Sequence, residues 1–299
     1  MVLAFSWPAL ATSASIQPFG LVEYKPGLYV HYGQQADMGA DNLGDIANIG
    51  FIVGSDSVAV IDPGGSPVVA KALFEAVSQQ TDLPVSHVIL THLHPDHMFG
   101  AALFPESAEI VAHERYPQAL VQRGQFYLDR FREPLALEDL ELIAPDRLVS
   151  MATPVEIDLG GRKLLIQAYP TAHTDNDISI WDVNSETLWA SDLVFVERIP
   201  SLDGSLRGWL DVLDQIQTGL KPRWVVPGHG EPGAWLASVQ PQREYLERLA
   251  AETRTAIAAN QRLSEAVDEI ATDGATDWLL FELRHRGNVT KAWTELEWE

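Results

Sequence analysis

Three histidines and one aspartate lie within the heptapeptide at residues 91–97, Thr-His-Leu-His-Pro-Asp-His, which directly follows a short apolar run. Neutral imidazole is the commonest protein ligand for zinc, and a carboxylate binds the same ion. His92 and His94 are separated by one residue, so an extended backbone directs both rings to one side. The proline that follows favours a turn or a helix start, which directs Asp96 and His97 to a second point. This spacing predicts two adjacent metal ions rather than one, with a chance cluster of solvated histidines as the alternative.

Three further residues of metal-ligand type follow segments that are predicted to be strands. His173 comes after a strand ending at residue 168, Asp192 after one ending near residue 189, and His229 after one ending at residue 226. Loops at one edge of a sheet hold the functional residues of many layered α/β proteins, so these side chains are expected to meet the first cluster. The glycines that flank His229 permit a tight turn that presents its ring. The predicted metal site comprises His92, His94, Asp96, His97, His173, Asp192 and His229.

The segments that must position these residues alternate between strands and helices, which predicts an α/β layered protein. Strands are predicted at residues 28–32, 47–53, 57–61, 85–90, 109–112, 155–159, 163–168, 178–181, 187–190 and 224–226, and helices at residues 67–80, 98–104, 205–220 and 240–260. Residues 116–146 are interrupted by prolines and form a candidate lid over the site. The acidic end at residues 295–299 is predicted to be a solvated tail or an edge contact.

Composition limits the classes of partner and of metal site. The 299 residues are 46% hydrophobic, which is sufficient for a large globular core, and the formal net charge is -22. Such an acidic chain is not expected to bind nucleic acid or an anionic membrane. No cysteine is present, so any transition metal must be held by histidine and carboxylate. No apolar run is long enough to span a membrane. The expected partner is a small-molecule substrate.

The N-terminal segment, residues 1–20, has two interpretations. Residues 2–10 are mostly apolar and are followed by small residues, as in a cleaved export signal, but the first basic residue is Lys25. The segment is therefore either a signal that directs the protein to the periplasm or a loose terminus of a cytoplasmic protein. Residues 21–299 are predicted to form a single domain.

The order of these motifs resembles the metallo-β-lactamase superfamily across residues 48–230, including Asp62 in the turn at a strand end. That resemblance implies a four-layer αββα sandwich with a helical insertion and C-terminal helices. It also implies a dinuclear zinc site. The resemblance assigns His92, His94 and His173 to the first zinc, Asp96, His97 and His229 to the second, and Asp192 to a bridge between them.

A narrower resemblance covers nearly the whole chain. Residues 44–50, 171–177, 200–204 and 293–299 are similar to segments of the quinoprotein relay system zinc metallohydrolases. This subgroup implies a periplasmic location and an association with exported quinoprotein systems. It does not imply a defined substrate or oligomeric state.

The implied activity is that of a dinuclear zinc hydrolase whose metal-bridging hydroxide attacks a carbonyl-type substrate, namely an ester, lactone or thioester. Asp96 is the predicted catalytic residue, because it is placed to orient the nucleophile and to assist proton transfer to the leaving group. One alternative is a sulfur dioxygenase on the same fold with a single iron, which would leave His97 and His229 without a role. The other alternative is a metal-binding accessory protein without turnover.

Two features of the sequence limit the class of substrate that the enzyme is expected to hydrolyse. Lactamases with a comparable three-histidine first site lack a bridging aspartate, so Asp192 predicts weak or absent β-lactam turnover. The net charge of -22 disfavours anionic ligands unless a local basic patch reverses the field. The nearest basic residues in the sequence, Arg198, Arg207 and Arg223, are scattered. Neutral esters, lactones or thioesters are therefore expected in preference to glutathione conjugates.

Overall fold

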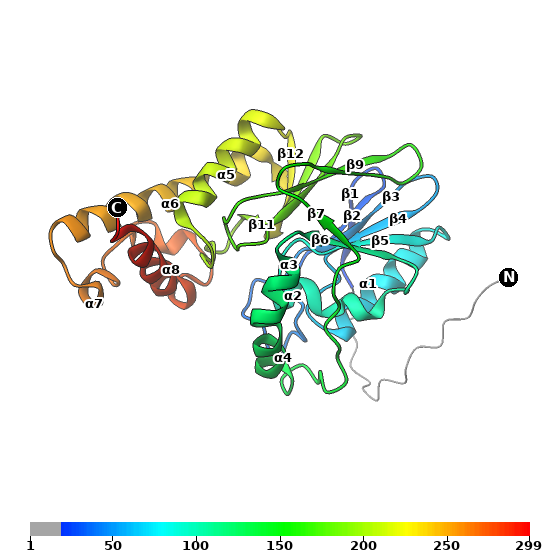
Figure 1. Ribbon diagram of the computed structural model, residues 1–299, viewed down its shortest axis with the longest axis horizontal. Helices are drawn as coiled ribbons and strands as arrows, with labels where there is room; N and C mark the ends of the chain where they lie inside the picture. The colour runs from blue at the N-terminus through cyan, green and yellow to red at the C-terminus, as the bar shows by residue number, and fades with distance from the viewer. Residues whose placement is uncertain (1–18) are drawn as a thin grey trace.

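The computed structural model describes residues 19–299, in which two β-sheets pack face to face between layers of helices (Figure 1). The prediction for residues 1–20 lies almost wholly outside the described residues. The seven-stranded sheet contains, in spatial order, β1 (Leu21–Lys25), β2 (Leu28–His31), β3 (Ile49–Val53), β4 (Val58–Ile61), β5 (Val85–Ile89), β6 (Glu109–His113) and β7 (Arg147–Val149). The six-stranded sheet contains β13 (Gly233–Ala234), β12 (Trp224–His229), β11 (Thr187–Phe195), β10 (Ile178–Asp182), β9 (Lys163–Ala168) and β8 (Val155–Asp158).

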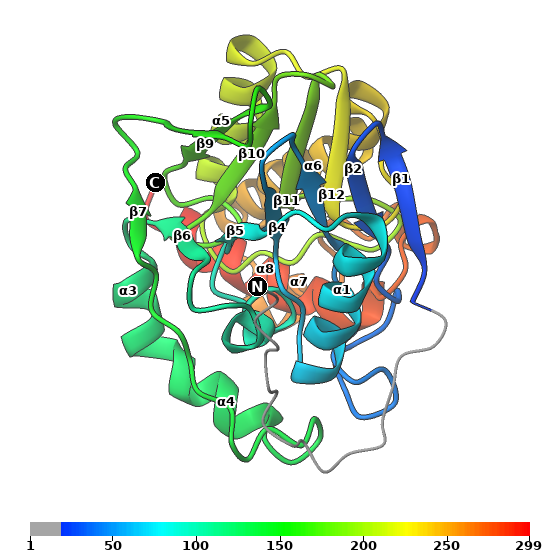
Figure 2. The ribbon, with the colours of Figure 1, turned by 90° about the vertical axis from the view of Figure 1, so that its right-hand side faces the viewer.

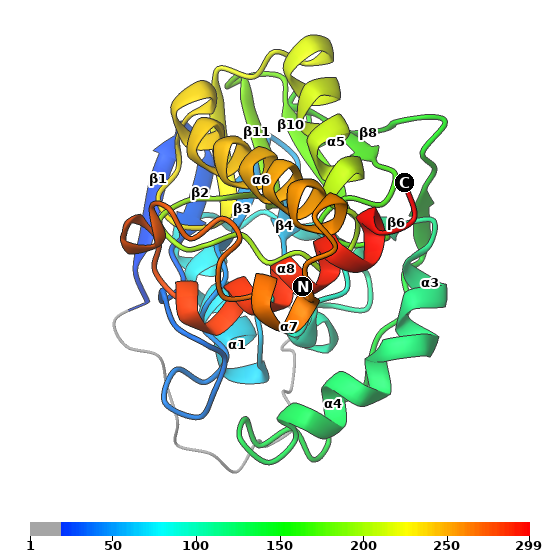
Figure 3. The same ribbon diagram turned by 90° about the vertical axis from the view of Figure 1, so that its left-hand side faces the viewer.

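Helices cover the outer face of each sheet. The seven-stranded sheet is covered on the side seen in Figure 2 by α1 (Pro67–Gln80), and the short α2 (Pro95–Met98) and the 3-10 segment η1 (Phe99–Leu103) follow β5. The segments α3 (Tyr116–Ala119), π-helical η2 (Leu120–Gly124) and α4 (Gln125–Phe131) extend away from the sheets at the lower left of Figure 2. The six-stranded sheet is covered on the side seen in Figure 3 by α5 (Leu206–Gly219), α6 (Trp235–Ala258), α7 (Leu263–Ala266), the 3-10 turn η3 (Ala275–Asp277) and α8 (Phe281–Leu296). None of the helices in residues 19–299 has both the length and the apolar character that crossing a bilayer requires.

The apolar residues form three clusters, one in each gap between the four layers. Between the two sheets, Ile61 and Ile89 of the first sheet share a cluster with Ile180 and Trp189 of the second. A second cluster joins the first sheet to α1 and to residues 116–146, which form the helical insertion. A third cluster joins the second sheet to α5, α6 and α8. Central strands such as β4 are buried on both faces and are correspondingly rich in Val and Ile. The predicted four-layer αββα sandwich is confirmed.

The helix that follows β4 illustrates why local sequence predicted many of the bounds. Ser66 adopts an extended conformation, and its side chain accepts a hydrogen bond from Val69 N at 3.3 Å. Pro67 occupies the first turn, where its missing N–H has no intrahelical partner to lose. These two signals begin α1 at Pro67, as the sequence predicts.

Two strand ends differ from the prediction in a way that matters for the site. β11 continues to Phe195 and β12 to His229, so Asp192 lies within a strand and His229 is the last residue of one. The pairing of β11 with β12 shifts register on both sides of Ser191, whose φ is 48°. This irregularity redirects the backbone beside Asp192, as β-bulges commonly do near active sites. Strand β1 was not predicted, and α6 begins at Trp235 rather than at residue 240.

The acidic C-terminal end makes edge contacts through Glu295 and Glu299, so that alternative of the prediction is confirmed and the solvated tail is wrong. Residues up to Leu296 belong to α8, and Glu295 caps the N-terminus of α5. Its carboxylate accepts hydrogen bonds from Leu206 N at 2.7 Å, from Ser205 Oγ at 2.9 Å and from Arg207 N at 3.2 Å. A carboxylate at a helix N-terminus satisfies free N–H groups and interacts favourably with the helix dipole. The cap thus holds the loop before α5, which carries part of the site.

Glu295→Ala is expected to lower the free energy of unfolding by about 1–2 kcal/mol, because the N-terminal N–H groups of α5 lose a charged acceptor. Urea denaturation of the full chain measures this difference. Glu297→Ala is the matched control, since Glu297 is exposed and should change stability by less than about 0.5 kcal/mol. Equal stabilities of the two variants would contradict a capping role for Glu295.

Candidate metal centre

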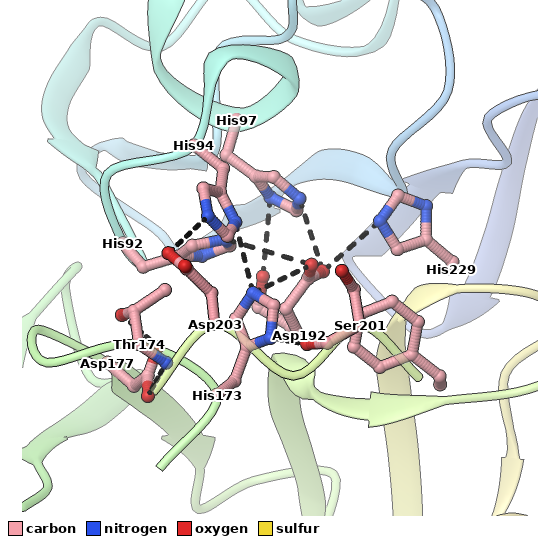
Figure 4. A network of polar contacts seen from close by, with 12 residues as sticks. His92, His94, His97, His173, Thr174, Asp177, Asp192, Ser201, Asp203 and His229 are labelled. Carbon is pink, nitrogen blue, oxygen red and sulfur yellow. Dashed lines mark hydrogen bonds and ion pairs between the residues drawn. The ribbon is translucent and has the colours of Figure 1, made fainter. Parts of the chain in front are cut away.

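All seven residues that the sequence predicted as a metal site lie together at one edge of the two sheets. Figure 4 shows all of them by label except Asp96. Each sheet contributes part of the set. From the first sheet, His92 and His94 lie in the loop after β5, and Asp96 and His97 lie in α2. From the second sheet come His173, in the loop after β9, Asp192 in β11, and His229 at the end of β12.

The donor atoms form two groups. In the first, His94 Nδ1 lies 3.0 Å from His92 Nε2 and 3.0 Å from His173 Nε2. In the second, Asp96, His97 and His229 each present one donor atom, and these atoms lie within 4.8 Å of one another. His92 and His94 thus lie in one group and Asp96 and His97 in the other, and the spacing of residues 91–97 predicted this separation of the side chains.

Asp192 lies between the groups and turns one oxygen toward each. Its Oδ2 is 3.3 Å from His173 Nε2 and 3.7 Å from His92 Nε2. Its Oδ1 is 3.2 Å from His97 Nε2 and 3.4 Å from His229 Nε2. This orientation is the one that a carboxylate shared by two ions would adopt.

The ring nitrogen of each histidine that points away from the centre contacts an oxygen atom. The five pairs are His92 Nδ1 with Thr91 Oγ1 at 3.0 Å, His94 Nε2 with Asp203 Oδ2 at 3.3 Å, His97 Nδ1 with Asp62 Oδ2 at 2.8 Å, His173 Nδ1 with Ser201 O at 2.7 Å, and His229 Nδ1 with Ile46 O at 2.7 Å. An outer nitrogen that donates to such an oxygen leaves the inner nitrogen with a bare lone pair in the neutral ring. The surrounding oxygens therefore orient the five rings as metal ligands, as partners of metal-bound histidines generally do.

This donor set fits metal ions. Two unprotonated ring nitrogens repel each other at about 3.0 Å, the distance between His94 Nδ1 and His92 Nε2, unless a positive charge lies between them. Two donors at zinc bond lengths and tetrahedral angles are separated by roughly 3.3 Å, which is close to the observed spacing. Moreover, His97 Nε2 and Asp192 Oδ1 are buried and have no hydrogen-bond partner among residues 19–299. A shared cation would satisfy both atoms.

Electrostatics differ between the two groups. Burial lowers the pKa of His173 to about 4 and that of His92 well below its usual value, so both rings are neutral at physiological pH. Burial acts to lower the pKa of His97 as well, but Asp192, Asp96 and Asp62 together raise it well above normal. The three carboxylates thus require a positive charge near His97, which a metal ion or a proton supplies.

The buried carboxylate of Asp62 organises the loop that carries the histidines. It accepts hydrogen bonds from Thr91 N at 2.8 Å, from Thr91 Oγ1 at 2.8 Å and from Ser191 Oγ at 3.1 Å, besides the contact with His97. Its backbone adopts a left-handed conformation with φ 51°, which is rare for a residue other than glycine. Strain of this kind persists where surrounding contacts over-determine the position. Asp62 therefore links the end of β4, the histidine loop and β11.

Asn48 and Gly228 join the two sheets beside His229. The Asn48 side chain donates to Pro227 O at 2.9 Å and to Gly230 O at 2.7 Å, and its backbone N donates to Gly228 O at 2.7 Å. A Cβ atom at Gly228 would collide with Asp192 Oδ1, so only glycine fits there. The glycine before His229 is therefore required by close packing, and the glycine after it by its φ of 92°.

The sequence did not predict a part for Asp203 or Arg123. Asp203 Oδ2 contacts His94 and also accepts a hydrogen bond from Arg123 Nη1 at 2.9 Å. Arg123 lies in the π-helical segment η2 of the insertion, and its Nη2 donates to Asp175 Oδ1 at 2.7 Å. The insertion is therefore tied directly to two loops of the site. The sequence signalled these segments only in general terms, through the candidate lid at residues 116–146 and the similarity of residues 171–177 and 200–204 to the zinc metallohydrolases.

Asp203→Asn is expected to weaken zinc binding at the first group by about tenfold, because the acceptor that orients His94 loses its charge. Competition with a chromophoric chelator measures the affinity. Asp211→Asn, an exposed substitution on α5, is the control and should leave the affinity unchanged. An Asp203 variant with control-like affinity would show that His94 is oriented by other contacts.

Residues 43–229 match the family described as the metallo-beta-lactamase superfamily, which is more than half of the chain. No match was found among curated proteins. Among solved structures, a metallo-beta-lactamase from Pontibacter korlensis is similar with a TM-score of 0.62 and 18% identity, over 76% of this chain and 98% of that one.

Two other solved structures are similar at the same level of identity. The stereoselective inverting sec-alkylsulfatase Pisa1 from Pseudomonas sp. has a TM-score of 0.71 and 18% identity over 93% of this chain, which spans 50% of that one. The metallo-beta-lactamase IND-7 has a TM-score of 0.61 and 18% identity, over 78% of this chain and 100% of that one. These likenesses show the fold, and the family match extends from the loop before β3 to His229. The chain therefore belongs to the metallo-beta-lactamase superfamily and is an enzyme of that superfamily.

Proposed function

We propose that this protein is a dinuclear zinc hydrolase that acts on an ester, lactone or thioester. In this proposal His92, His94 and His173 hold the first zinc, Asp96, His97 and His229 hold the second, and Asp192 bridges both. The observation that carries the proposal is the orientation of Asp192, whose two oxygens face different groups of donors at 3.2–3.7 Å. A single-metal site would need only one of these groups, so the arrangement supports the hydrolase over the mononuclear-iron dioxygenase.

Two bound zinc ions would supply a water ionised near neutral pH and a Lewis acid for the carbonyl oxygen. Asp96 is the residue of this chain that supports proton movement. Its Oδ2 lies 3.5 Å from His229 Nε2 and 3.6 Å from His97 Nε2, and its side chain remains partly open to the cavity over the site. It can therefore orient the attacking water and pass a proton to the leaving group.

The cavity next to the donor set is small and is lined by both polar and apolar side chains. Its volume is about 290 Å³, and Phe126, Tyr127 and Phe131 of the insertion form part of its wall. Burial raises the pKa of Tyr127 to about 12, so its hydroxyl stays protonated and can donate a hydrogen bond to a substrate. The insertion that the sequence identified as a candidate lid supplies this wall, which supports a small substrate.

The proposal also includes the bounds of the domain, the location of the protein and the systems with which it associates. We assign residues 21–299 to one hydrolase domain, because the three apolar clusters connect all four layers. The similarity of four segments to the quinoprotein relay system zinc metallohydrolases supports a periplasmic location and an association with exported quinoprotein systems.

Asp192→Asn is expected to reduce the zinc content from about two ions per chain to about one, because the bridge loses the charge that holds two dications close. Metal analysis after dialysis against zinc-free buffer measures the stoichiometry. Asp139→Asn, on the exposed part of the insertion, is the control and should retain the wild-type content. Two zinc ions held at wild-type affinity by the Asp192 variant would refute the bridge.

Carbonyl substrates without a β-lactam ring are expected to be turned over best. The comparison uses kcat/KM for an aryl ester, a lactone, a cephalosporin and a secondary alkyl sulfate, the last because one structural neighbour is named an alkylsulfatase. We expect the ester or lactone to exceed the cephalosporin by at least about tenfold, which corresponds to about 1.4 kcal/mol in transition-state stabilisation. A lead for the cephalosporin or the alkyl sulfate would overturn the assigned substrate class, and loss of all activity with chelator is the control.

A further inference from the structure

Arg198 is a buried guanidinium that lines the cavity over the metal centre. It is 3% exposed, and it follows β11 on the side of the second donor group. The backbone on either side is held in place, since Val196 N donates to His229 O at 2.9 Å and Ile199 N donates to Leu279 O at 3.0 Å. The side chain is therefore presented to the cavity from a fixed position, without the freedom of a surface arginine.

The guanidinium has no acceptor that fully satisfies it. Its Nη1 lies 3.1 Å from His229 Nδ1, but that nitrogen also lies 2.7 Å from Ile46 O. When His229 offers Nε2 to a metal, Nδ1 carries the hydrogen and donates to Ile46 O, so it cannot accept from Arg198. The Nε atom of Arg198 is buried and has no hydrogen-bond partner among residues 19–299. Burial lowers the pKa of Arg198, yet arginine stays charged at neutral pH because its ordinary pKa is above 12.

The carboxylates around the cavity are already engaged. Asp37 forms an ion pair with Arg284, and Asp203 forms one with Arg123. Asp96 and Asp192 belong to the proposed zinc ligands. A buried charge without a partner is costly, so an unpaired buried arginine beside a cavity indicates an anion that arrives with a ligand.

A second arginine strengthens this charge pattern. Arg130 of α4 also lines the cavity, is exposed, and forms no ion pair within the part of the chain that the structure describes. The expectation of a neutral substrate rested on basic residues that are scattered in the sequence. In three dimensions Arg130, Arg198 and Arg284 line one cavity, so basic residues do gather there, together with the carboxylates of Asp37, Asp96, Asp192 and Asp203. Because these four carboxylates are engaged, Arg198 and Arg130 are the charges of the cavity wall that an anionic ligand can neutralise, even though the net charge of the chain is -22.

We propose that Arg198 binds an oxyanion of the substrate, so that the hydrolase acts on small esters, lactones or thioesters that carry a carboxylate or a sulfate group. This inference rests on the proposed function and narrows its substrate class. The planar guanidinium matches a carboxylate or sulfate through two parallel N–H donors, which fixes the substrate as well as attracting it. An anion held by Arg198 would lie next to His229, on the side of the second donor group. Arg130 at the exposed side of the cavity would attract the same charge during entry.

The test compares matched aryl esters whose acyl ends carry a neutral amide, a carboxylate or a sulfate. For each enzyme, the ratio of kcat/KM for an anionic ester to that for the neutral ester is measured. In Arg198→Gln this ratio should fall about 10- to 100-fold, chiefly through KM, because a charged hydrogen bond is lost. Arg198→Lys should lower this ratio by an intermediate factor, since lysine keeps the charge but lacks the two parallel N–H donors of arginine. Arg223→Gln removes an exposed arginine and should leave the ratio at its wild-type value.

Zinc content and the midpoint of thermal unfolding are measured for every variant. If Arg198→Gln does not fold, the same comparison is made with Arg198→Lys. Calorimetric binding of succinate and of sulfate to the zinc-loaded protein provides a readout that does not require turnover, and shows which oxyanion is preferred. Binding that weakens tenfold or more in the Arg198 variants supports the inference even if no ester is hydrolysed, an outcome that would refute only the proposed function. Unchanged ratios together with unchanged succinate and sulfate binding would overturn the role of Arg198.

Discussion

The structure depends on one electrostatic constraint: five imidazoles and two carboxylates meet at a buried point, with their donor atoms directed at one another. Oxygens behind the rings turn the bare nitrogens of His92, His94 and His173 inward, where they lie about 3 Å apart. Such an arrangement is unfavourable without positive charge at its centre. The fold therefore has to hold these groups rigidly, and bound cations would in turn stabilise the fold through linkage.

The two sheets share this task through a small number of polar links across their edges. Asp62 connects the end of β4 to the histidine loop and to β11, while Asn48 connects the loop before β3 to the turn around His229. The register shift beside Ser191 redirects the backbone next to Asp192, and Gly228 leaves room for the Asp192 carboxylate. The apolar cluster between the sheets fixes their relative position, and the polar links convert that position into the geometry of the centre.

The segments added to the sandwich determine what reaches the centre. The insertion supplies aromatic walls and, through Arg123, a clamp on the loop that orients His94. The C-terminal helices support the loop before α5 through Glu295 and bring Arg284 to the cavity. The chain is strongly acidic and four carboxylates line the cavity, but these carboxylates are engaged and Arg198 has no carboxylate partner. The charge of Arg198 acts on a ligand in the cavity at short range and with little solvent screening, because the side chain is buried.

The sequence by itself determined the layered fold and the identity of the seven residues that gather at the centre. Strand and helix periodicities are local, and residues after neighbouring strands must meet at one sheet edge, so both could be predicted without coordinates. Tertiary structure alone decided how the oxygens of Asp192 divide between two groups, and that Arg198 remains unpaired in the cavity. It also decided that Glu295 caps a helix whose N-terminus lies 89 residues earlier. These outcomes depend on how the layers pack, because each joins side chains from distant segments whose contacts no local pattern encodes.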